Sequence, residues 1–495
     1  MPPASHGADP DGPRAVPDYD RHLRRAVWIV ALCVVAGAAV VYSGKAADER
    51  SAFIRWRPQI LEFGRGVNIY DIRFFPNPPM MPLTLYPLMV LPPVAGALVW
   101  FGLKAALAAL SAWACLRMVA PPGVSARAEV ASWLRNTRNL ARRALTPSAD
   151  IPPAEIPPHP IPSWVQATIL VLSFRPILSD LHHGNNNLLI LALVVASLAA
   201  WRRGYDVLAG LILALSITYK VTPGLFLLYY ASRRSWRAVG ATLLGMGIFL
   251  LIVPSLFLGP GFNGRCLGMW WHRIMSPYVT GDVAGFQEIN QSMVGVVMRL
   301  LTAQESEERY SVLLKNLHLM SLDPRAVVIG LKSASVAILV LLGFLCRTKA
   351  SRRDDPRLLG EFSLVVLAML FVSERSWKHH YVTVLLPYTY LTYRVFDPRI
   401  SGRARAAIAS ALGLSALLMA STSSEVGGLF ARGQGHKIAQ FYGMFFWAGA
   451  VLFAATAWRV RVEGRSAPSA VPPHHVPAMH VRLDRAGRAE PATPG

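Results

Sequence analysis

Residues 362–393 read FSLVVLAMLFVSERSWKHHYVTVLLPYTYLTY, two apolar runs that flank a short polar stretch. The apolar runs extend from Phe362 to Val372 and from Tyr381 to Tyr393, and a lysine and two histidines lie between them. Ionisable side chains are costly in hydrocarbon, so they are placed within membrane segments mainly for function. The stretch Ser376–His380 therefore predicts a hydrated functional surface at the junction of two helices.

Apolar runs of this kind recur along the whole chain. Hydrophobic residues make up 53% of the 495 residues, and charged residues make up only 16%. Runs of roughly 16 to 24 apolar residues are long enough to cross a bilayer as helices, whereas the strands of a membrane β-barrel are about ten residues long and alternate in polarity. We therefore expect an all-α polytopic membrane protein with about 11 to 13 transmembrane helices.

Positive charge is gathered in short loops between the apolar runs. The net charge is +22, and arginines cluster at 201–203, 233–237, 347–357, 394–405 and 459–465. Cytoplasmic loops of membrane proteins carry such an excess of Lys and Arg. The charge therefore predicts an integral protein of a bacterial-type inner membrane with both termini in the cytoplasm, and it does not require a nucleic-acid partner. The four cysteines are widely spaced and predict neither a disulfide framework nor a metal cluster.

The two ends of the chain differ in composition from the rest. Residues 1–25 and 461–495 are rich in proline and polar groups and are predicted to be disordered cytoplasmic tails. A cleaved signal peptide is the competing interpretation of the N-terminal region. The transmembrane domain is expected to cover residues 26–460, with a cytoplasmic insertion rich in arginine and proline at 120–160.

Alternating the apolar runs across the membrane places most of the notable polar groups on its outer side. They are Asp48 and Glu49, Tyr70 and Asp71, His182 to Asn187, Lys220, Asn290 to Ser292, and Trp377 to His380. These groups are far apart in the sequence, so their convergence is an expectation from topology. The pattern predicts one cavity that opens outward.

The order of several short motifs resembles that of a known family. The motifs are Gly66–Tyr70 (GVNIY), Phe75–Pro79 (FPNPP), Gly184–Asn187 (GNNN), Lys220–Pro223 (KVTP) and Ser376–His380 (SWKHH). Over residues 25–460 the chain is similar to glycosyltransferase family 87, the polyprenol-phosphate-mannose-dependent mannosyltransferases of the GT-C fold. It departs from the family pattern at Asn185, where glutamine is usual, and at Glu374–Arg375, where Ser-Pro is frequent.

The resemblance implies transfer of a hexose, mannose in this family, from a polyprenyl-phosphate donor to a hydroxyl of a lipid or glycan acceptor on the outer face. The expected partners are membrane lipid, the lipid-linked donor and the acceptor, with no cofactor and no metal site. A transporter or lipid-linked-sugar flippase and an inactive scaffold are the alternatives. A transporter is expected to show repeats with paired broken helices, and only the break at Lys220–Pro223 is clear.

The attacking hydroxyl needs a carboxylate base. Asp48 closely follows the first apolar run, as the family pattern requires, and is the predicted base. The alternative role of Asp48 is the N-cap of a helix that begins near Arg50. Glu49 and Asp71 are the alternate candidates for the base.

The departing phosphate needs cationic and hydrogen-bonding groups where negative charge develops. His379 and His380 are the predicted catalytic residues here, with no choice between them. The residues predicted to bind the donor phosphate or sugar are Lys220, Lys378, Asn185, Asn187 and Tyr70, with Gln291 as an alternate.

Each of these polar groups also has a structural interpretation. The histidines and Lys378 are typical of an interfacial anchor beside Trp377. Lys220 also fits a hydrated break between two short helices. His182 and His183 lack the three or four ligands that zinc needs, and Arg175 is a candidate partner for Asp180.

Overall fold

A computed structural model describes residues 18–72, 75–119, 163–277, 287–303, 317–348, 353, 355–397 and 400–465. Within these residues the chain forms helices and no strand, which confirms the all-α prediction. The predicted insertion at 120–160 and most of both predicted tails lie outside the described residues. Residues 18–25 and 461–465, which we assigned to the tails, belong to the first and last helices.

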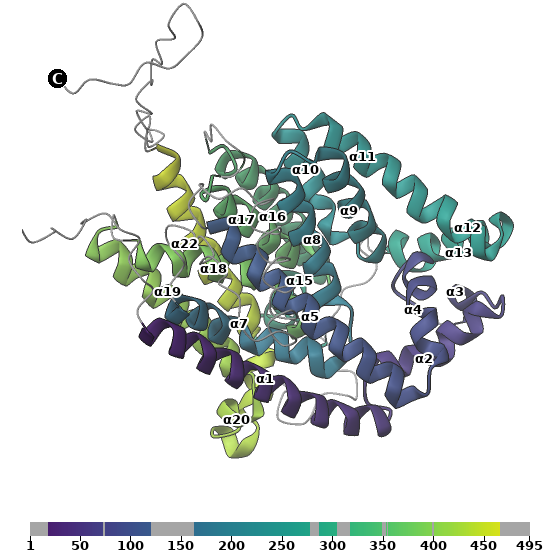
Figure 1. Ribbon diagram of the computed structural model, residues 1–495, viewed down its shortest axis with the longest axis horizontal. Helices are drawn as coiled ribbons and strands as arrows, with labels where there is room; N and C mark the ends of the chain where they lie inside the picture. Colours follow the sequence, from purple (N-terminus) through teal and green to yellow (C-terminus); the bar gives the residue numbers. More distant parts are fainter. Residues whose placement is uncertain are drawn as a thin grey trace, which may run out of the picture.

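The first part of the chain contains the break at Lys220. After this break, helices α11 to α13 extend to the right of Figure 1. The helices of this part are α1 (Asp18–Ala47), α2 (Ala52–Gly64), α3 (Ile69–Ile72), α4 (Met80–Val90), α5 (Pro93–Val119), α7 (Ser163–His183), α8 (Asn187–Arg202), α9 (Asp206–Tyr219), η1 (Thr222–Gly224), α10 (Leu225–Ser232), α11 (Trp236–Gly247), η2 (Ile248–Ile252), α12 (Val253–Leu258), α13 (Pro260–Trp270) and η3 (Trp271–Met275).

The second part contains the polar stretch that separates the two apolar runs. Its helices are α15 (Met293–Leu301), α16 (Pro324–Leu345), α17 (Leu358–Val372), η5 (Lys378–Val384), α18 (Leu385–Phe396), α19 (Gly402–Ala420), α20 (Ser424–Gly427), η6 (Ala431–Gly433), α21 (Gly435–Phe441) and α22 (Met444–Arg465).

Six of the described helices are long and apolar enough to cross a membrane. They cover residues 25–47, 93–119, 236–258, 324–345, 402–420 and 444–463. Four shorter apolar helices, α4, α8, α9 and α17, accompany them. The chain is therefore an integral membrane protein of several helices. The expected number of about 11 to 13 crossings stays a prediction, because these shorter helices do not meet the length of a full span.

The central helices pack so that segments distant in sequence meet. Helix α1 runs along the lower edge of the molecule in Figure 1 and packs against α7 and α5. Helix α9 packs between α8 and α11, while η5 packs against α7, α8 and α17. The short 3-10 segment η5 thus lies at the centre of the contacts that bring the two parts of the chain together.

The polar stretch lies at a helix junction, as the sequence predicted. Helix α17 ends at Val372, and the second apolar run divides into η5 and α18. Pro387 has no backbone N–H, and proline fits best in the first turn of a helix, where this group needs no partner within the helix. It is the third residue of α18, so the regular helix begins at Leu385 and the preceding residues form the tighter 3-10 turn.

Candidate functional site

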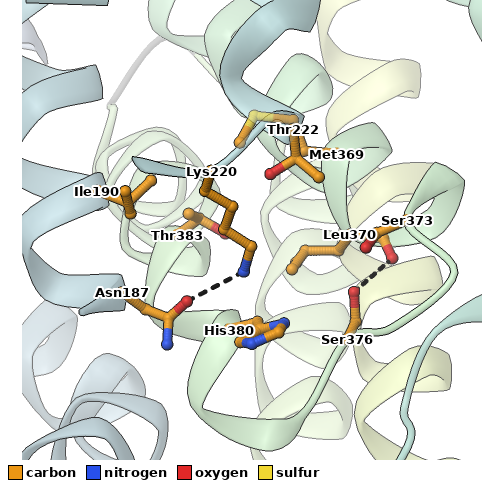
Figure 2. A pocket seen from close by; sticks show the side chains of 10 residues that line it. All are labelled: Asn187, Ile190, Lys220, Thr222, Met369, Leu370, Ser373, Ser376, His380 and Thr383. Carbon is orange, nitrogen blue, oxygen red and sulfur yellow. Dashed lines mark hydrogen bonds between the residues drawn. The ribbon is translucent and has the colours of Figure 1, made fainter. Parts of the chain in front are cut away.

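A small pocket lies where α8, the break after α9, α17 and η5 meet. Its lining residues are Asn187, Ile190, Lys220, Thr222, Met369, Leu370, Ser373, Ser376, His380 and Thr383. The space between these side chains is about 320 Å³ when the open solvent at its mouth is included. Figure 2 shows Lys220, Asn187 and His380 directed toward one another. The predicted convergence of these three residues is therefore present in the structure.

Lys220 stands at the break between two helices. Its backbone is extended (φ −158°, ψ 127°), and Pro223 occupies the short η1 segment that follows. The ammonium group Nζ donates a hydrogen bond to Asn187 Oδ1 at 3.1 Å. Burial lowers the pKa of Lys220 to about 7, although the negative charge of Asp180 acts in the opposite direction. The lysine is thus readily switched between its charged and neutral forms near neutral pH.

Behind Asn187 lies an ion pair that the sequence reasoning did not identify. Lys104 Nζ lies 3.2 Å from Asp180 Oδ2, and both side chains are fully buried. Asp180 Oδ1 accepts a hydrogen bond from Asn187 Nδ2 at 3.0 Å. The signal that could have found the pair is Lys104 itself, a lone charge within the apolar run of α5. The predicted pairing of Asp180 with Arg175 is wrong, since Arg175 donates to Thr422 O at 3.2 Å.

His379 is buried behind the pocket wall. Its ring stacks on that of His183, with centroids 4.2 Å apart and planes inclined by 17°. Asn185 Oδ1 accepts from the backbone N–H of Asn186 at 2.8 Å, so its amide nitrogen faces His379 Nε2 at 3.1 Å. Burial, and then the neighbouring histidines, hold the pKa of His379 well below its usual range. A neutral His379 that accepts at Nε2 carries its proton on Nδ1.

His380 lines the pocket, unlike His379. Its Nδ1 accepts a hydrogen bond from the backbone N–H of Trp377 at 3.3 Å. Burial and the charge of Lys220 hold the pKa of His380 well below its usual range, against a hydrogen bond with the backbone of Arg375. The neutral ring therefore carries its proton on Nε2. The two histidines differ both in position and in the nitrogen that is protonated.

The loop before η5 is fixed by the segment 290–292. Asn290 Oδ1 accepts from the backbone N–H of Ser376 at 3.0 Å, and the backbone N–H of Gln291 donates to Ser376 O at 2.6 Å. Ser292 Oγ donates to Glu374 O at 2.9 Å and caps helix α15. Gln291 is not among the pocket residues, and its side-chain amide donates to Gln440 O at 2.7 Å. The segment positions Ser376 at the pocket wall.

Tyr70 is buried near the pocket but does not line it. Its hydroxyl donates to Asn77 O at 2.8 Å, and Asn77 Nδ2 donates to Tyr219 O at 2.6 Å. Tyr219 is the residue before Lys220, so Tyr70 supports the break rather than facing the pocket. Asp71 is exposed, and its backbone oxygen accepts a hydrogen bond from Arg273.

Asp48 and Glu49 form the turn between α1 and α2, and neither lines the pocket. The Asp48 side chain is 58% exposed and pairs with Arg50 at 2.6 Å. The alternative role of Asp48 as an N-cap is wrong, because Ser51 caps α2 by accepting from Ile54 N at 3.2 Å. Glu49 adopts a left-handed conformation with φ of 57°.

Cationic groups on both sides of this turn act on His183. His183 has its pKa lowered to about 4, first by burial and then by cationic groups that include Arg55 and Lys45. Lys378 is half-buried and outside the pocket lining, and burial followed by Arg175 and Lys45 lowers its pKa. His183 and Lys378 therefore experience positive charge from the end of α1 and, for His183, from α2.

The described residues contain no group of three or more His, Cys, Asp or Glu side chains that could hold a metal ion. The expectation from the sequence that the protein needs no metal and no other cofactor stays a prediction.

Comparison with known proteins gives two matches. The profile of glycosyltransferase family 87 matches residues 75–373, which is more than half of the chain. A curated relative from Mycolicibacterium smegmatis, named a polyprenol-phosphate-mannose-dependent alpha-(1-2)-phosphatidylinositol mannoside mannosyltransferase, is 26% identical over 231 residues. That region covers 45% of this chain and 46% of the relative, or about half of the relative's length. Asn185, Asn187 and Lys220 fall within the matched family region, and the chain belongs to glycosyltransferase family 87.

Proposed function

We propose that the protein is a membrane mannosyltransferase that moves mannose from a polyprenyl-phosphate donor to a hydroxyl of a lipid or glycan acceptor. The reaction takes place at the extracytoplasmic face of an inner membrane, and both termini are cytoplasmic. Membership of the family and the name of the curated relative support the donor and the sugar. The observation that carries the proposal is the pocket in which Lys220, Asn187 and His380 meet.

The reaction makes a defined demand on this pocket. A bond forms between the acceptor oxygen and the anomeric carbon, and the bond from that carbon to the phosphate oxygen breaks. The bonding electrons leave with polyprenyl phosphate, whose negative charge rises as it departs. Preorganised donors that face such a developing charge lower the barrier. Lys220 in its ammonium form supplies a charge there, and His380 supplies the N–H of Nε2.

The remaining polar residues have supporting roles in this scheme. Asn187 holds Lys220 through the 3.1 Å hydrogen bond, and Asn185 holds His379 in its neutral form. His379 contacts His380, with ring centroids 4.9 Å apart. We assign the contact with the donor phosphate to His380. His379 is assigned the role of holding His380 in place at the pocket wall. Lys378, outside the pocket lining, would attract the anionic donor through its charge.

We assign the acceptor proton to Asp48. Asp48 is exposed in the turn between α1 and α2, where an acceptor that arrives from outside the protein can reach its carboxylate. Asp180, although closer to Lys220, is fully buried and paired with Lys104. An internal carboxylate that is already bonded to a lysine cannot reach an entering hydroxyl. Glu49 and Asp71 remain the alternates because both are exposed.

The test uses the purified full-length protein in lipid vesicles with radiolabelled polyprenyl-phosphate mannose and a membrane lipid extract as the source of acceptor. We expect mannose to move from the donor to extract lipid. Replacing Asp48 by Asn should lower turnover by about 10²- to 10⁴-fold, which is the usual contribution of a general base. Arg50→Gln, which removes the partner of Asp48 and keeps the carboxylate, is the matched control and should retain turnover.

Each outcome of this assay has a distinct meaning. Full turnover by Asp48→Asn removes Asp48 as the base and directs the search to Glu49→Gln and Asp71→Asn. Movement of intact donor between the leaflets without transfer supports a flippase. Absence of both transfer and movement in the unmodified, folded protein contradicts the proposed activity.

A further inference from the structure

The buried pair of Lys104 and Asp180 joins α5 to the end of α7. Lys104 Nζ donates to the backbone oxygen of Asp180 at 2.6 Å and lies 3.2 Å from its carboxylate. Both side chains have no exposed surface. Removing two charges from water is costly, and a buried ion pair often adds no net stability compared with apolar residues. The pair therefore calls for a reason other than packing.

Asp180 also determines how the Asn187 amide is oriented. A carboxylate accepts hydrogen bonds and does not donate them. The contact of 3.0 Å to Asp180 Oδ1 must therefore come from the amide nitrogen of Asn187. The amide oxygen then points the other way and accepts from Lys220 Nζ at 3.1 Å. Asp180 further accepts from the backbone N–H of Leu188 at 3.4 Å, which ties it to the start of α8.

We propose that Asp180, held by Lys104, is a positioning residue that fixes the Asn187 amide and through it the direction of the Lys220 ammonium group. The chain of contacts runs from α5 through α7 and α8 to the break after α9. Identification of the pocket as the donor-phosphate site rests on the proposed function, whereas the chain of contacts does not. A reacting group held in advance by neighbouring hydrogen bonds loses less freedom when the ligand binds.

The charges that face Lys220 make this role measurable. Asp180 is the negative group that acts on Lys220, and it raises the pKa of the lysine against the effect of burial. The titratable groups on the other side are His379 and His380, whose pKa values are lowered first by burial and then by neighbouring groups that include Lys220. Removing the charge of Asp180 should therefore favour the neutral form of Lys220, while a merely structural change should leave its titration unaltered.

The test compares Asp180→Asn and the double variant Lys104→Gln/Asp180→Asn with the unmodified full-length protein. The double variant removes both charges together, so it is the form expected to fold if Asp180→Asn alone does not. Ser173→Ala, in the buried part of the same helix, is the matched control. Trace acetylation of Lys220 with acetic anhydride across a pH series, read by mass spectrometry, gives the titration of Lys220 without any need for activity. The Michaelis constant for polyprenyl-phosphate mannose is measured in parallel.

We expect the labelling midpoint of Lys220 to fall by about one pH unit in a folded Asp180 variant, as is usual for the loss of a nearby opposite charge. The donor KM should rise about tenfold, with a smaller change in kcat. Ser173→Ala should change neither quantity. An unaltered Lys220 titration in a folded Asp180 variant would overturn the proposal. A shifted titration in a protein that transfers no mannose would preserve the positioning role and contradict the proposed function alone.

Discussion

The two adjacent histidines are held in different protonation patterns. Asn185 presents its amide nitrogen to Nε2 of His379, so that ring carries its proton on Nδ1. The backbone of Trp377 presents an N–H to Nδ1 of His380, so that ring carries its proton on Nε2. Because His380 lines the pocket and His379 does not, only one of the two can contact a ligand there.

Substitution of each histidine should separate these roles. His380→Ala removes a donor at the developing charge and should lower kcat by about 10²-fold. His380→Gln keeps a neutral N–H donor and should recover part of that loss. His379→Ala leaves Asn185 without its partner and opens a space beside His183, so its main effect should be a lower melting temperature in detergent. Equal loss of kcat in both alanine variants with unchanged melting would contradict this division.

The pKa of Lys220 predicts a dependence of donor binding on pH. Burial lowers this pKa to about 7, so the lysine is charged below that pH and increasingly neutral above it. An anionic donor stabilises the charged form, and binding therefore weakens as pH rises. The donor KM should increase by up to about tenfold for each pH unit above 7. Lys220→Arg keeps its charge over this range and should flatten the profile; a profile that is equally steep in this variant would exclude Lys220 as its origin.

At the scale of elements, the turn after α7 fixes the site. Gly184 has a positive φ of 75°, and its backbone oxygen accepts from Trp100 Nε1 at 3.1 Å. A Cβ at this position would lie 2.6 Å from the Tyr42 hydroxyl and 3.3 Å from Phe53 N. Helices α1, α2 and α5 thus close around a turn that only glycine fits without strain. Asn185 and Asn187 follow at once, so this packing sets their positions.

Gly184→Ala and Gly204→Ala form a matched pair of variants. Both glycines have positive φ, 75° and 83°, but a Cβ at Gly204 would meet nothing within 4 Å. Gly204→Ala should cost only the conformational strain of about 1 kcal/mol. Gly184→Ala adds a steric clash, so it should lower the melting temperature further and reduce transfer activity. Equal melting temperatures for the two variants would show that the turn tolerates a side chain.

At the scale of the molecule, ion pairs join separate helices where the arginine clusters lie. Glu361 is fully buried and pairs with Arg233, and it accepts hydrogen bonds from Tyr229 at 2.8 Å and from Thr348 N at 2.7 Å. On α18, Arg394 pairs with Glu463 at 2.8 Å. Two of the arginines from which a cytoplasmic face was predicted, Arg233 and Arg394, therefore also make tertiary contacts.

Loss of the Glu361 carboxylate should destabilise the protein. Glu361→Gln leaves Arg233 without its negative partner in a largely buried place, and breaking such a pair costs roughly 3 to 5 kcal/mol. Asp355→Asn is the control, because the Asp355 side chain is 16% exposed whereas that of Glu361 has no exposed surface, and its partner Arg357 lies only two residues away in sequence. Thermal unfolding in detergent should show a much larger decrease for Glu361→Gln. Similar decreases would mean that the buried pair contributes little.

The sequence alone indicated the class of the protein and several of the polar side chains that line its pocket. Apolar runs and interspersed arginines indicate membrane helices because hydrocarbon excludes charge and unpaired backbone groups. The isolated charge of Lys220 and the polar stretch ending at His380 were visible for the same reason. These signals are local, and each can be read without knowledge of the neighbouring helices.

Only the tertiary structure decided which residues share the pocket. It placed His380 at the wall with Lys220 and Asn187, put His379 behind it, and left the turn of Asp48 at the surface. It also paired Asp180 with Lys104, 76 positions away in the chain. Such contacts depend on how helices from distant parts of the sequence pack. The spacing of residues along the chain determines which side chains share one face of a helix. Which neighbouring helix that face contacts depends on how all the helices pack together.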